Sequence, residues 1–228
     1  MAIAGLTAAG KTTHARLLAD ALGYRYVSAT GILLELLGIE SDTGRAWFDH
    51  QERIRKARSA GDVDAELDRR LIQLATEEDG LVLDSWAIAW TCRVPMVRLW
   101  FESDALSRTW KCFVSQGESP EHDLDGCLRI IEDKDTSTRD LFLQHHGFDL
   151  FLDREIFDAI LDNTHLIHRP TRRAADAGIA AFAPVVQAVV ESLLSDRQGD
   201  LASAALNWTN DQRSCLVHVR RKRGDDPS

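Results

Sequence analysis

The chain has 228 residues, of which 44% are hydrophobic and 28% are charged, as in ordinary globular proteins. This length suits one large α/β domain with a lid and is short for two domains. The net charge of −9, with a pI near 5.3, argues against a nucleic acid or an anionic membrane surface as the main partner. Any phosphate group must therefore be bound locally, by a few cations and backbone N–H groups.

The cysteines and the hydropathy pattern indicate a compartment. Cys92, Cys112, Cys127 and Cys215 show no paired metal spacing, and a reducing cytoplasm suits them. No segment reaches the roughly 18 apolar residues of a membrane span, and no signal peptide precedes the first motif. We therefore expect a cytoplasmic protein, a monomer or a dimer, whose partner is a small molecule and neither a nucleic acid nor a membrane.

The first half of the chain alternates short apolar runs with amphipathic segments. Strands are predicted over 2–4, 24–27 and 80–84, and helices from 11 to 22, over 30–37 and from 63 to about 78. Residues 38–62 are polar, punctuated by glycine and poorly periodic. We predict a mobile insertion there.

The second half continues the alternation. Strands are predicted over 94–101 and 157–162, and helices after the N-cap Asp104, around 123–132, and from about 172 to 195 with a bend at Pro184. A turn-rich stretch is predicted between 132 and 149. Residues 196–228 have weak periodicity and form a C-terminal extension. This pattern predicts an α/β fold with a parallel sheet covered by helices on both faces, in which ligands bind at the carboxyl ends of the strands.

A glycine-rich segment separates the first strand from the first helix. It reads Gly5-Leu6-Thr7-Ala8-Ala9-Gly10-Lys11-Thr12 and fits the pattern G-x-x-x-x-G-K-[ST]. Its glycines let the backbone wrap phosphates, and its N–H groups point inward at the positive end of the helix. Lys11 is expected to reach the β- and γ-phosphates of ATP, and the Thr12 hydroxyl to bind Mg²⁺. The predicted nucleotide-binding residues are Gly5, Ala8, Ala9, Gly10, Lys11, Thr12 and Thr13.

Asp84 ends the apolar strand over 80–84 and is the natural second contact for Mg²⁺, through water because Mg²⁺ keeps much of its hydration shell. The alternative is an aspartate that caps a helix or a turn. Gly5–Thr12, Asp84 and 162–164 each follow a predicted strand, so we expect them at one edge of the sheet. These signals predict a nucleotide site and say nothing of the phosphoryl acceptor.

Four further stretches carry a resemblance. They are Tyr26-Val27-Ser28-Ala29-Thr30-Gly31, Val63-Asp64-Ala65-Glu66-Leu67-Asp68, Lys134-Asp135-Thr136-Ser137-Thr138-Arg139, and the run of Gly147-Phe148-Asp149, Asp153 and Phe157-Asp158-Ala159-Ile160-Leu161-Asp162-Asn163-Thr164. In order, they are similar to the start of the acceptor-binding helix, the paired-aspartate helix, the lid segment (one residue shorter here) and the closing run of one family. With the glycine-rich segment, they make residues 2–165 resemble the cytidylate kinase family of nucleoside monophosphate kinases, especially its archaeal-type members.

The resemblance implies a P-loop NTPase fold with a five-stranded parallel sheet and a kinase domain over 1–195. An acceptor-binding insertion over about 30–78 and a lid over about 104–150 are implied within it. The implied reaction is phosphoryl transfer from ATP to a monophosphate, which needs positioning and neutralisation of charge. The residues implied as catalytic are Lys11, Asp84, Arg108 and Arg139, with Lys111, Arg129 and Lys134 as further cations. The residues implied in acceptor binding are Ser28, Asp64, Asp68 and Trp86.

Two positions depart from the family pattern. Family members carry an arginine in the acceptor helix and a Gly-Arg after the third strand, where this chain has Leu34 and Ser85-Trp86. Both arginines normally grip the acceptor's phosphate or base, and a forked cation makes strong charge-assisted bonds to phosphate. Trp86 makes this wall aromatic instead, unless it belongs to the core. If the register is shifted, Arg45, Arg53 or Arg93 could take over the missing role.

Other polar groups have plainer interpretations. Each lid cation could be a solvated surface charge, and Asp64 and Asp68 could be solvated acids on a helix face. His145 and His146 are adjacent and point apart, so we interpret them as a surface pair and not as a metal site. The basic run at 220–223 is interpreted as a disordered end.

Three functions remain open on the sequence. The first is a monophosphate kinase acting on a CMP-like, dCMP-like or modified pyrimidine nucleotide. The second is a kinase for an unphosphorylated acceptor, such as a nucleoside, a sugar or a natural-product alcohol, with Asp84 or Asp64 accepting the hydroxyl proton. The third is a nucleotide-binding protein without catalytic activity.

Overall fold

The computed structural model describes residues 1–39, 50–59, 62–117, 123–195 and 198–220. Its centre is a six-stranded sheet in the order β2-β3-β1-β4-β5-β6. The strands are β1 (Ala2–Gly5), β2 (Arg25–Ser28), β3 (Leu81–Asp84), β4 (Arg98–Glu102), β5 (Ala159–Asp162) and β6 (Leu216–Val219). β1 to β5 are parallel, and β6 runs antiparallel to β5.

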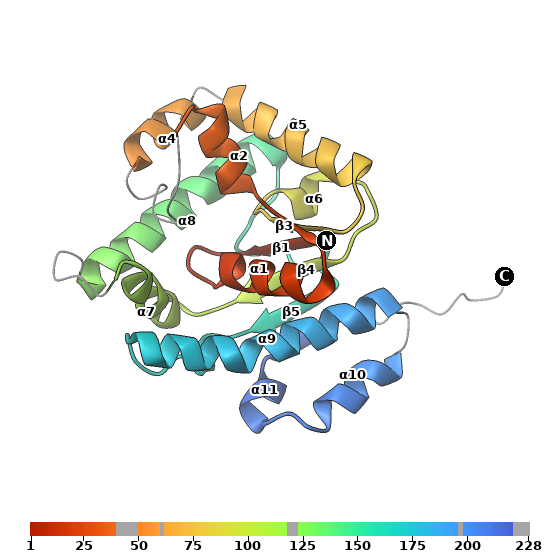
Figure 1. Cartoon of the computed structure of the whole chain (residues 1–228). Helices are drawn as coiled ribbons and strands as arrows, with labels where there is room; N and C mark the ends of the chain where they lie inside the picture. The colour runs from red at the N-terminus through yellow and green to blue at the C-terminus, as the bar shows by residue number, and fades with distance from the viewer. Residues whose placement is uncertain (40–49, 60–61, 118–122, 196–197, 221–228) are drawn as a thin grey trace.

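Helices cover both faces of the sheet (Figure 1). On one face lie α1 (Lys11–Leu22) and α9 (Arg172–Ser195), and α9 in turn contacts α10 (Gln198–Ala205) and α11 (Asn210–Ser214). On the other side lie α2 (Ala29–Leu36), α4 (Gln51–Ser59), α5 (Asp62–Glu77) and α6 (Ile88–Thr91). α7 (Ala105–Ser115) and α8 (Leu124–His146) pack against each other, and a 3₁₀ turn, η1 (Thr164–Leu166), follows β5.

The strands supply two cores because successive side chains point to opposite faces. On β4, Trp100 packs into the cluster with α2, α5 and α6, whereas Leu99 and Phe101 pack into the cluster with α1 and α9. All four residues of β3 and of β1 are buried. Strands that are buried on both faces are continuous apolar runs, which is why the sequence shows them clearly.

The strand registers bring the polar strand ends to one edge. Ser28 pairs with Asp84, Gly5 with Phe101, and Glu102 with Asp162. The glycine-rich segment, Asp84 and the turn after β5 therefore share the carboxyl edge of the sheet, as the sequence predicts.

α8 corrects the sequence analysis. The turn-rich stretch predicted after residue 132 is wrong, because one helix runs from Leu124 to His146. Its ends are defined by Asp123, whose side chain accepts from the Gly126 N–H, and by Gly147, whose φ is 72°. The buried face is narrow, so the charged residues on the remaining surface obscure the periodicity. Its buried residues are Cys127, Ile131, Asp135, Thr138 and Phe142.

Two other regions differ from expectation. The sequence predicts five strands, and β6 adds a sixth, none of whose residues is fully buried, so that its pattern is weak. Within the predicted mobile insertion, 51–59 forms α4 and Asp62 begins α5. Residues 40–49 and 60–61 of that insertion, and 221–223 of the basic run, lie outside the described residues.

Within the described part of the chain, α9 has the length and composition of a membrane span, with an 18-residue window of mean hydropathy 1.7. Gln187 and Glu191 interrupt its apolar sequence. Phe182, Val185 and Val189 are fully buried in the cluster that α9 shares with the sheet. One face of α9 therefore packs against the sheet, while 28% of the window as a whole is buried.

We predict that Gly5→Ala destabilises the fold by about 2–4 kcal/mol. A Cβ at Gly5 would lie 2.7 Å from the Phe101 carbonyl oxygen, and its φ of +151° disfavours any side chain. Gly31→Ala is the control, because its Cβ would meet nothing closer than Ser28 at 3.5 Å. Denaturant unfolding measures both variants, and equal stabilities would contradict the expected close packing of β1 on β4.

Candidate active site

The glycine-rich segment forms a compact turn between β1 and α1. Ala8 and Gly10 have φ values of 60° and 92°, and Gly10 caps α1 in the left-handed conformation. Lys11 is buried, and its Nζ donates to the Leu6 carbonyl oxygen at 2.9 Å, closing the turn on itself. Burial lowers the pKa of Lys11 to about 8, against the opposing effect of the Asp84 carboxylate. A buried ammonium at the N-terminus of a helix is suited to binding an anion.

Asp84 meets the turn at the end of β3. The Thr12 hydroxyl donates to Asp84 Oδ2 at 2.6 Å, so the two residues predicted to bind Mg²⁺ are in contact. Tyr26 on β2, which the sequence analysis did not assign, donates its hydroxyl to the same oxygen at 3.1 Å. Hydroxyl and carboxylate oxygens are ligands that Mg²⁺ prefers.

Two side chains from other elements hold the turn. Asp135 of α8 accepts the Thr7 N–H through Oδ1 at 2.9 Å and binds Arg108 of α7 through Oδ2. Asn163, after β5, donates from Nδ2 to the Ala9 carbonyl oxygen at 2.9 Å. Sequence patterns missed both contacts because the partners are more than 100 residues apart.

Asn163 is itself held by a buried lysine. Lys111 Nζ donates to the Asn163 side-chain oxygen and to Ser103 Oγ, the latter at 2.9 Å. Burial lowers the pKa of Lys111 to about 7. The resemblance implies Lys111 as a phosphate-binding cation. In this structure Lys111 instead binds Asn163, which in turn binds the turn at Ala9.

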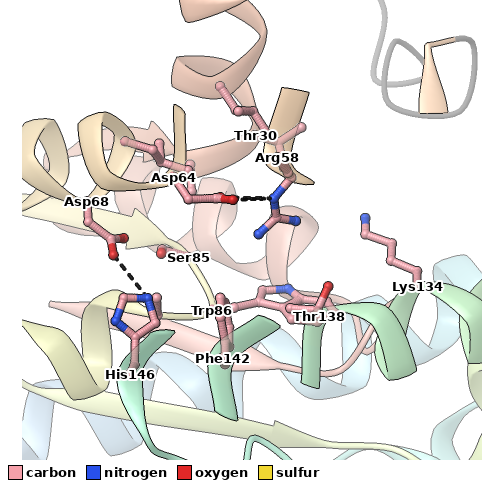
Figure 2. Close-up of a pocket in the computed structure, with 14 residues that line it drawn as sticks. Thr30, Arg58, Asp64, Asp68, Ser85, Trp86, Lys134, Thr138, Phe142 and His146 are labelled. Carbon is pink, nitrogen blue, oxygen red and sulfur yellow. Dashed lines mark hydrogen bonds and ion pairs between the residues drawn. The ribbon is translucent and has the colours of Figure 1, made fainter. Parts of the chain in front are cut away.

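A pocket opens next to the turn, between α2, α5, the segment after β3, and α8 (Figure 2). Its empty volume is about 570 Å³, part of which is open to solvent. Figure 2 shows Trp86 and Phe142 on one side and Arg58, Asp64 and Thr30 on the other. The lining residues are Ala29, Thr30, Leu33, Arg58, Asp64, Leu67, Asp68, Ser85, Trp86, Ala87, Lys134, Thr138, Phe142 and His146.

One face of α8 forms a whole wall of this pocket. Lys134, Thr138, Phe142 and His146 recur at intervals of four residues and therefore lie along one side of the helix. This spacing is visible in the sequence, but it has meaning only if the helix continues to residue 146. His146, interpreted from the sequence as a surface residue, in fact faces Asp68, with Nε2 and Oδ2 3.2 Å apart.

The end of the pocket nearest the turn is cationic. The ammonium groups of Lys11 and Lys134 lie 5.1 and 5.9 Å from the centre of the Trp86 ring. Burial lowers the pKa of Lys134 to about 7, and the nearby charges of Lys11 and Arg58 lower it further. Trp86 therefore lines the pocket and lies beside both lysines.

Two ion pairs occupy the rest of the pocket. Arg58 Nε donates to Asp64 Oδ1 at 2.9 Å, and both side chains are largely buried. Burial raises the pKa of Asp68, which pairs with His146. Arg58 was not among the arginines considered from the sequence, because it lies in α4, within the poorly periodic insertion.

Some residues singled out from the sequence do not line the pocket. Ser28 caps α2 by accepting the Gly31 N–H, and Leu34 is buried in the core, so Leu33 and not Leu34 lines the pocket. Arg139 pairs with Asp149 at 2.5 Å and is not a lining residue, so its part in catalysis stays a prediction.

The arginines considered as substitutes do not line the pocket in the described residues. Arg53 donates to the Leu37 carbonyl oxygen at 2.6 Å, Arg93 is exposed, and Arg45 lies outside the described residues. Among the described residues, no group of three or more His, Cys, Asp or Glu side chains is arranged to hold a metal.

The chain is similar in sequence to several archaeal cytidylate kinases. A cytidylate kinase of Pyrobaculum aerophilum is 29% identical over 167 residues, which cover 73% of this chain and 84% of that protein. A cytidylate kinase of Halorubrum lacusprofundi is 29% identical over 158 residues, which cover 69% of this chain and 77% of that protein. Among solved structures, shikimate kinase from Acinetobacter baumannii in complex with shikimate is 16% identical, with a TM-score of 0.45, over 86% of this chain and 93% of that chain.

A family match covers most of the sequence. Residues 1–165 match the family described as "Cytidylate kinase-like family", and the match spans the turn, the pocket and β1 to β5. The parallel sheet with its glycine-rich turn is a P-loop kinase fold, and a kinase of this kind uses ATP. The chain therefore belongs to the cytidylate kinase-like family of P-loop kinases.

Proposed function

We propose that this enzyme transfers the γ-phosphate of ATP·Mg²⁺ to a nucleoside monophosphate with a pyrimidine ring, such as CMP, dCMP or a modified pyrimidine nucleotide. The observation that carries the proposal is the cationic end of the pocket. The charges of Lys11 and Arg58 both lower the pKa of Lys134, and Trp86 lies beside both lysines. Buried cations that oppose one another are stabilised by an anion placed between them.

The donor half of the site supports ATP. The buried Arg108 Nε and Thr7 Oγ1 have no partner in the described structure, and buried polar atoms of this kind are normally satisfied by a ligand or a water. Lys11 and the amides at the start of α1 suit the phosphates. Thr12 and Asp84 fit a magnesium ion, which when bound would neutralise charge on the phosphates.

The acceptor half supports a phosphorylated substrate. The two arginines typical of the family are missing at Leu34 and Trp86, but Arg58 and Lys134 bring cations into the same pocket from α4 and α8. Position 34 faces the core, so the absence of arginine there removes nothing from this pocket. An arginine fork and a lysine together suit a monophosphate.

The rest of the pocket supports a flat, polar ring. Trp86 and Phe142 pack edge to face, with ring centres 6.4 Å apart, and offer an apolar surface to a planar group. Opposite them, Asp64 and Asp68 supply acceptors for ring donors. We assign these acids, with Trp86, to acceptor binding.

An unphosphorylated acceptor is the second candidate. It is favoured by the aromatic Trp86 at a position where the family carries arginine, because an apolar wall does not hold a phosphate. It requires Asp84 or Asp64 to accept a hydroxyl proton. Asp64 is already paired with Arg58, and Asp84 already accepts hydrogen bonds from the Thr12 and Tyr26 hydroxyls. We therefore rank this candidate second.

We also place the enzyme in the cytoplasm, as a monomer or a dimer. All four cysteines are free and buried, which supports a reducing compartment.

Turnover of a substrate panel tests the proposed function directly. With ATP and Mg²⁺, we expect ADP release with pyrimidine monophosphates or deoxymonophosphates and a loss of at least 100-fold in kcat/KM in Lys11→Ala, because the phosphates lose their ammonium. A coupled ADP assay measures both. Preference for unphosphorylated nucleosides or sugars would establish the second candidate instead, and no ADP release with any monophosphate would refute the first.

The role of Arg58 is separable from that of the donor site. Arg58→Ala is expected to raise KM for the monophosphate by about tenfold or more, because a charge-assisted bond is lost, while KM for ATP changes less than threefold. Arg69→Ala is the matched control, since Arg69 is exposed and pairs with Glu66 outside the pocket. Equal effects on both substrates would argue against a phosphate contact at Arg58.

Protonation of Lys134 gives a pH signature. Without a ligand, the pKa of Lys134 is about 7, and a bound phosphate dianion raises it. Acceptor binding at pH 8 should therefore be accompanied by uptake of a proton. Acceptor affinity therefore rises as the pH falls from about 9 to about 7, and this gain is complete below pH 7. Calorimetry in buffers of different ionisation enthalpy measures the uptake.

Lys134→Met should reduce this proton uptake, and Lys56→Met, an exposed lysine of α4, should leave it unchanged. Binding at pH 8 without proton uptake by the unmodified enzyme would show that no anion approaches Lys134.

A further inference from the structure

Arg108 and Asp135 form a buried ion pair directly beside the glycine-rich turn. Arg108 is 6% exposed and Asp135 is 2% exposed. Both also hold Thr7, because Asp135 Oδ1 accepts the Thr7 N–H at 2.9 Å and Arg108 Nη1 donates to the Thr7 carbonyl oxygen at 3.2 Å. A carboxylate thus lies against a turn whose chemistry is suited to phosphate.

The guanidinium of Arg108 is only partly used. Its Nη1 makes the contacts with Asp135 and Thr7, whereas its buried Nε has no partner in the described structure. The neighbouring Thr7 Oγ1 is also buried without a partner. Leaving buried polar atoms unsatisfied is costly, so these two atoms point to a polar ligand that completes the site.

The pair also acts on the lysine that binds phosphate. Burial has the largest effect on Lys11 and lowers its pKa. The Asp135 carboxylate opposes this effect, and the Arg108 guanidinium adds to it. Arg108 and Asp135 are therefore within electrostatic reach of the phosphate position. An incoming triphosphate would be attracted by Arg108 and repelled by Asp135.

We propose that Arg108 exchanges partners: in the empty site it is neutralised by Asp135, and when ATP or ADP binds it turns to the phosphates. Asp135 is then a positioning residue that keeps Arg108 beside the turn and limits nucleotide affinity, which favours release of ADP. The proposal rests on the binding of ATP by this site and adds the competition between an internal carboxylate and the nucleotide.

Asp135→Asn tests the exchange. Asparagine keeps an oxygen for the Thr7 N–H and has the same shape, but it has no charge to hold Arg108. We expect ADP and ATP to bind roughly tenfold more tightly, because the repelling charge is gone and the freed guanidinium is available. A residue that only maintains structure would give weaker binding. Calorimetric titration of the full chain with ADP and with ATP·Mg²⁺ provides the readout.

Asp133→Asn is the matched control, because Asp133 is an exposed acid of the same helix and its loss changes the net charge equally. Its affinity for nucleotide should stay within about twofold of the unmodified chain, since surface charges are screened. Asp135→Asn with affinity equal to or weaker than that of Asp133→Asn would overturn the exchange. Adding Arg108→Gln to Asp135→Asn should abolish the gain, and persistence of the gain would also overturn it.

If Asp135→Asn does not fold, a measurement on the unmodified chain still tests the proposal. In protein with ¹⁵N-labelled arginine, the Nε–H resonance of Arg108, assigned with Arg108→Lys, should move when ADP is added. A resonance that stays in place at saturating ADP shows that the ion pair persists and overturns the proposal, although ADP binding and the proposed function stand. No binding of ADP or ATP to the unmodified chain overturns both.

Discussion

The burial of positive charge beside the glycine-rich turn is the constraint on which this site depends. Lys11 and Lys134 are both largely removed from water at the junction of the turn and the pocket, and burial lowers the pKa of each. Hydrophobic packing alone gives no reason to place two ammonium groups near one aromatic ring, because each loses hydration there. The proposed function accounts for this cost, because phosphate groups of the donor and of the acceptor would bring negative charge to the junction. The stability of the protein and its affinity for phosphate would then be linked.

The fold brings the required groups together from distant parts of the chain. Parallel strands place the turn after β1, Asp84 after β3 and Asn163 after β5 at one edge, and no single segment could supply all three. α8 has a double role in this arrangement. Asp135 contacts the glycine-rich turn, whereas Lys134, one residue earlier, lines the pocket. A movement of this helix would therefore change both the turn and the pocket.

The parts of the site that the sequence predicts are those encoded by short local patterns. The glycine-rich turn and Asp84 were predicted because apolar strands precede them and because their chemistry requires fixed spacings. Residues 162–164 were expected at this edge, but the contacts of Arg58, Tyr26 and Asn163 were not predicted, since each acts through a partner brought close only by folding. His146 was misinterpreted for a different reason: the four-residue spacing from Lys134 to His146 is present in the sequence, but the polar composition of α8 concealed that the helix continues. β6 was missed because an exposed edge strand lacks a buried alternating pattern.

Binding of a nucleotide at the glycine-rich turn is the property on which the proposed function depends most directly. Calorimetric titration of folded, full-length protein with ATP, ADP and GTP tests this property without any assumption about the acceptor. We expect saturable one-to-one binding of ATP and ADP, and a loss of at least tenfold in affinity when Lys11 is replaced by alanine. Absence of heat and of any thermal stabilisation with all three nucleotides would contradict it.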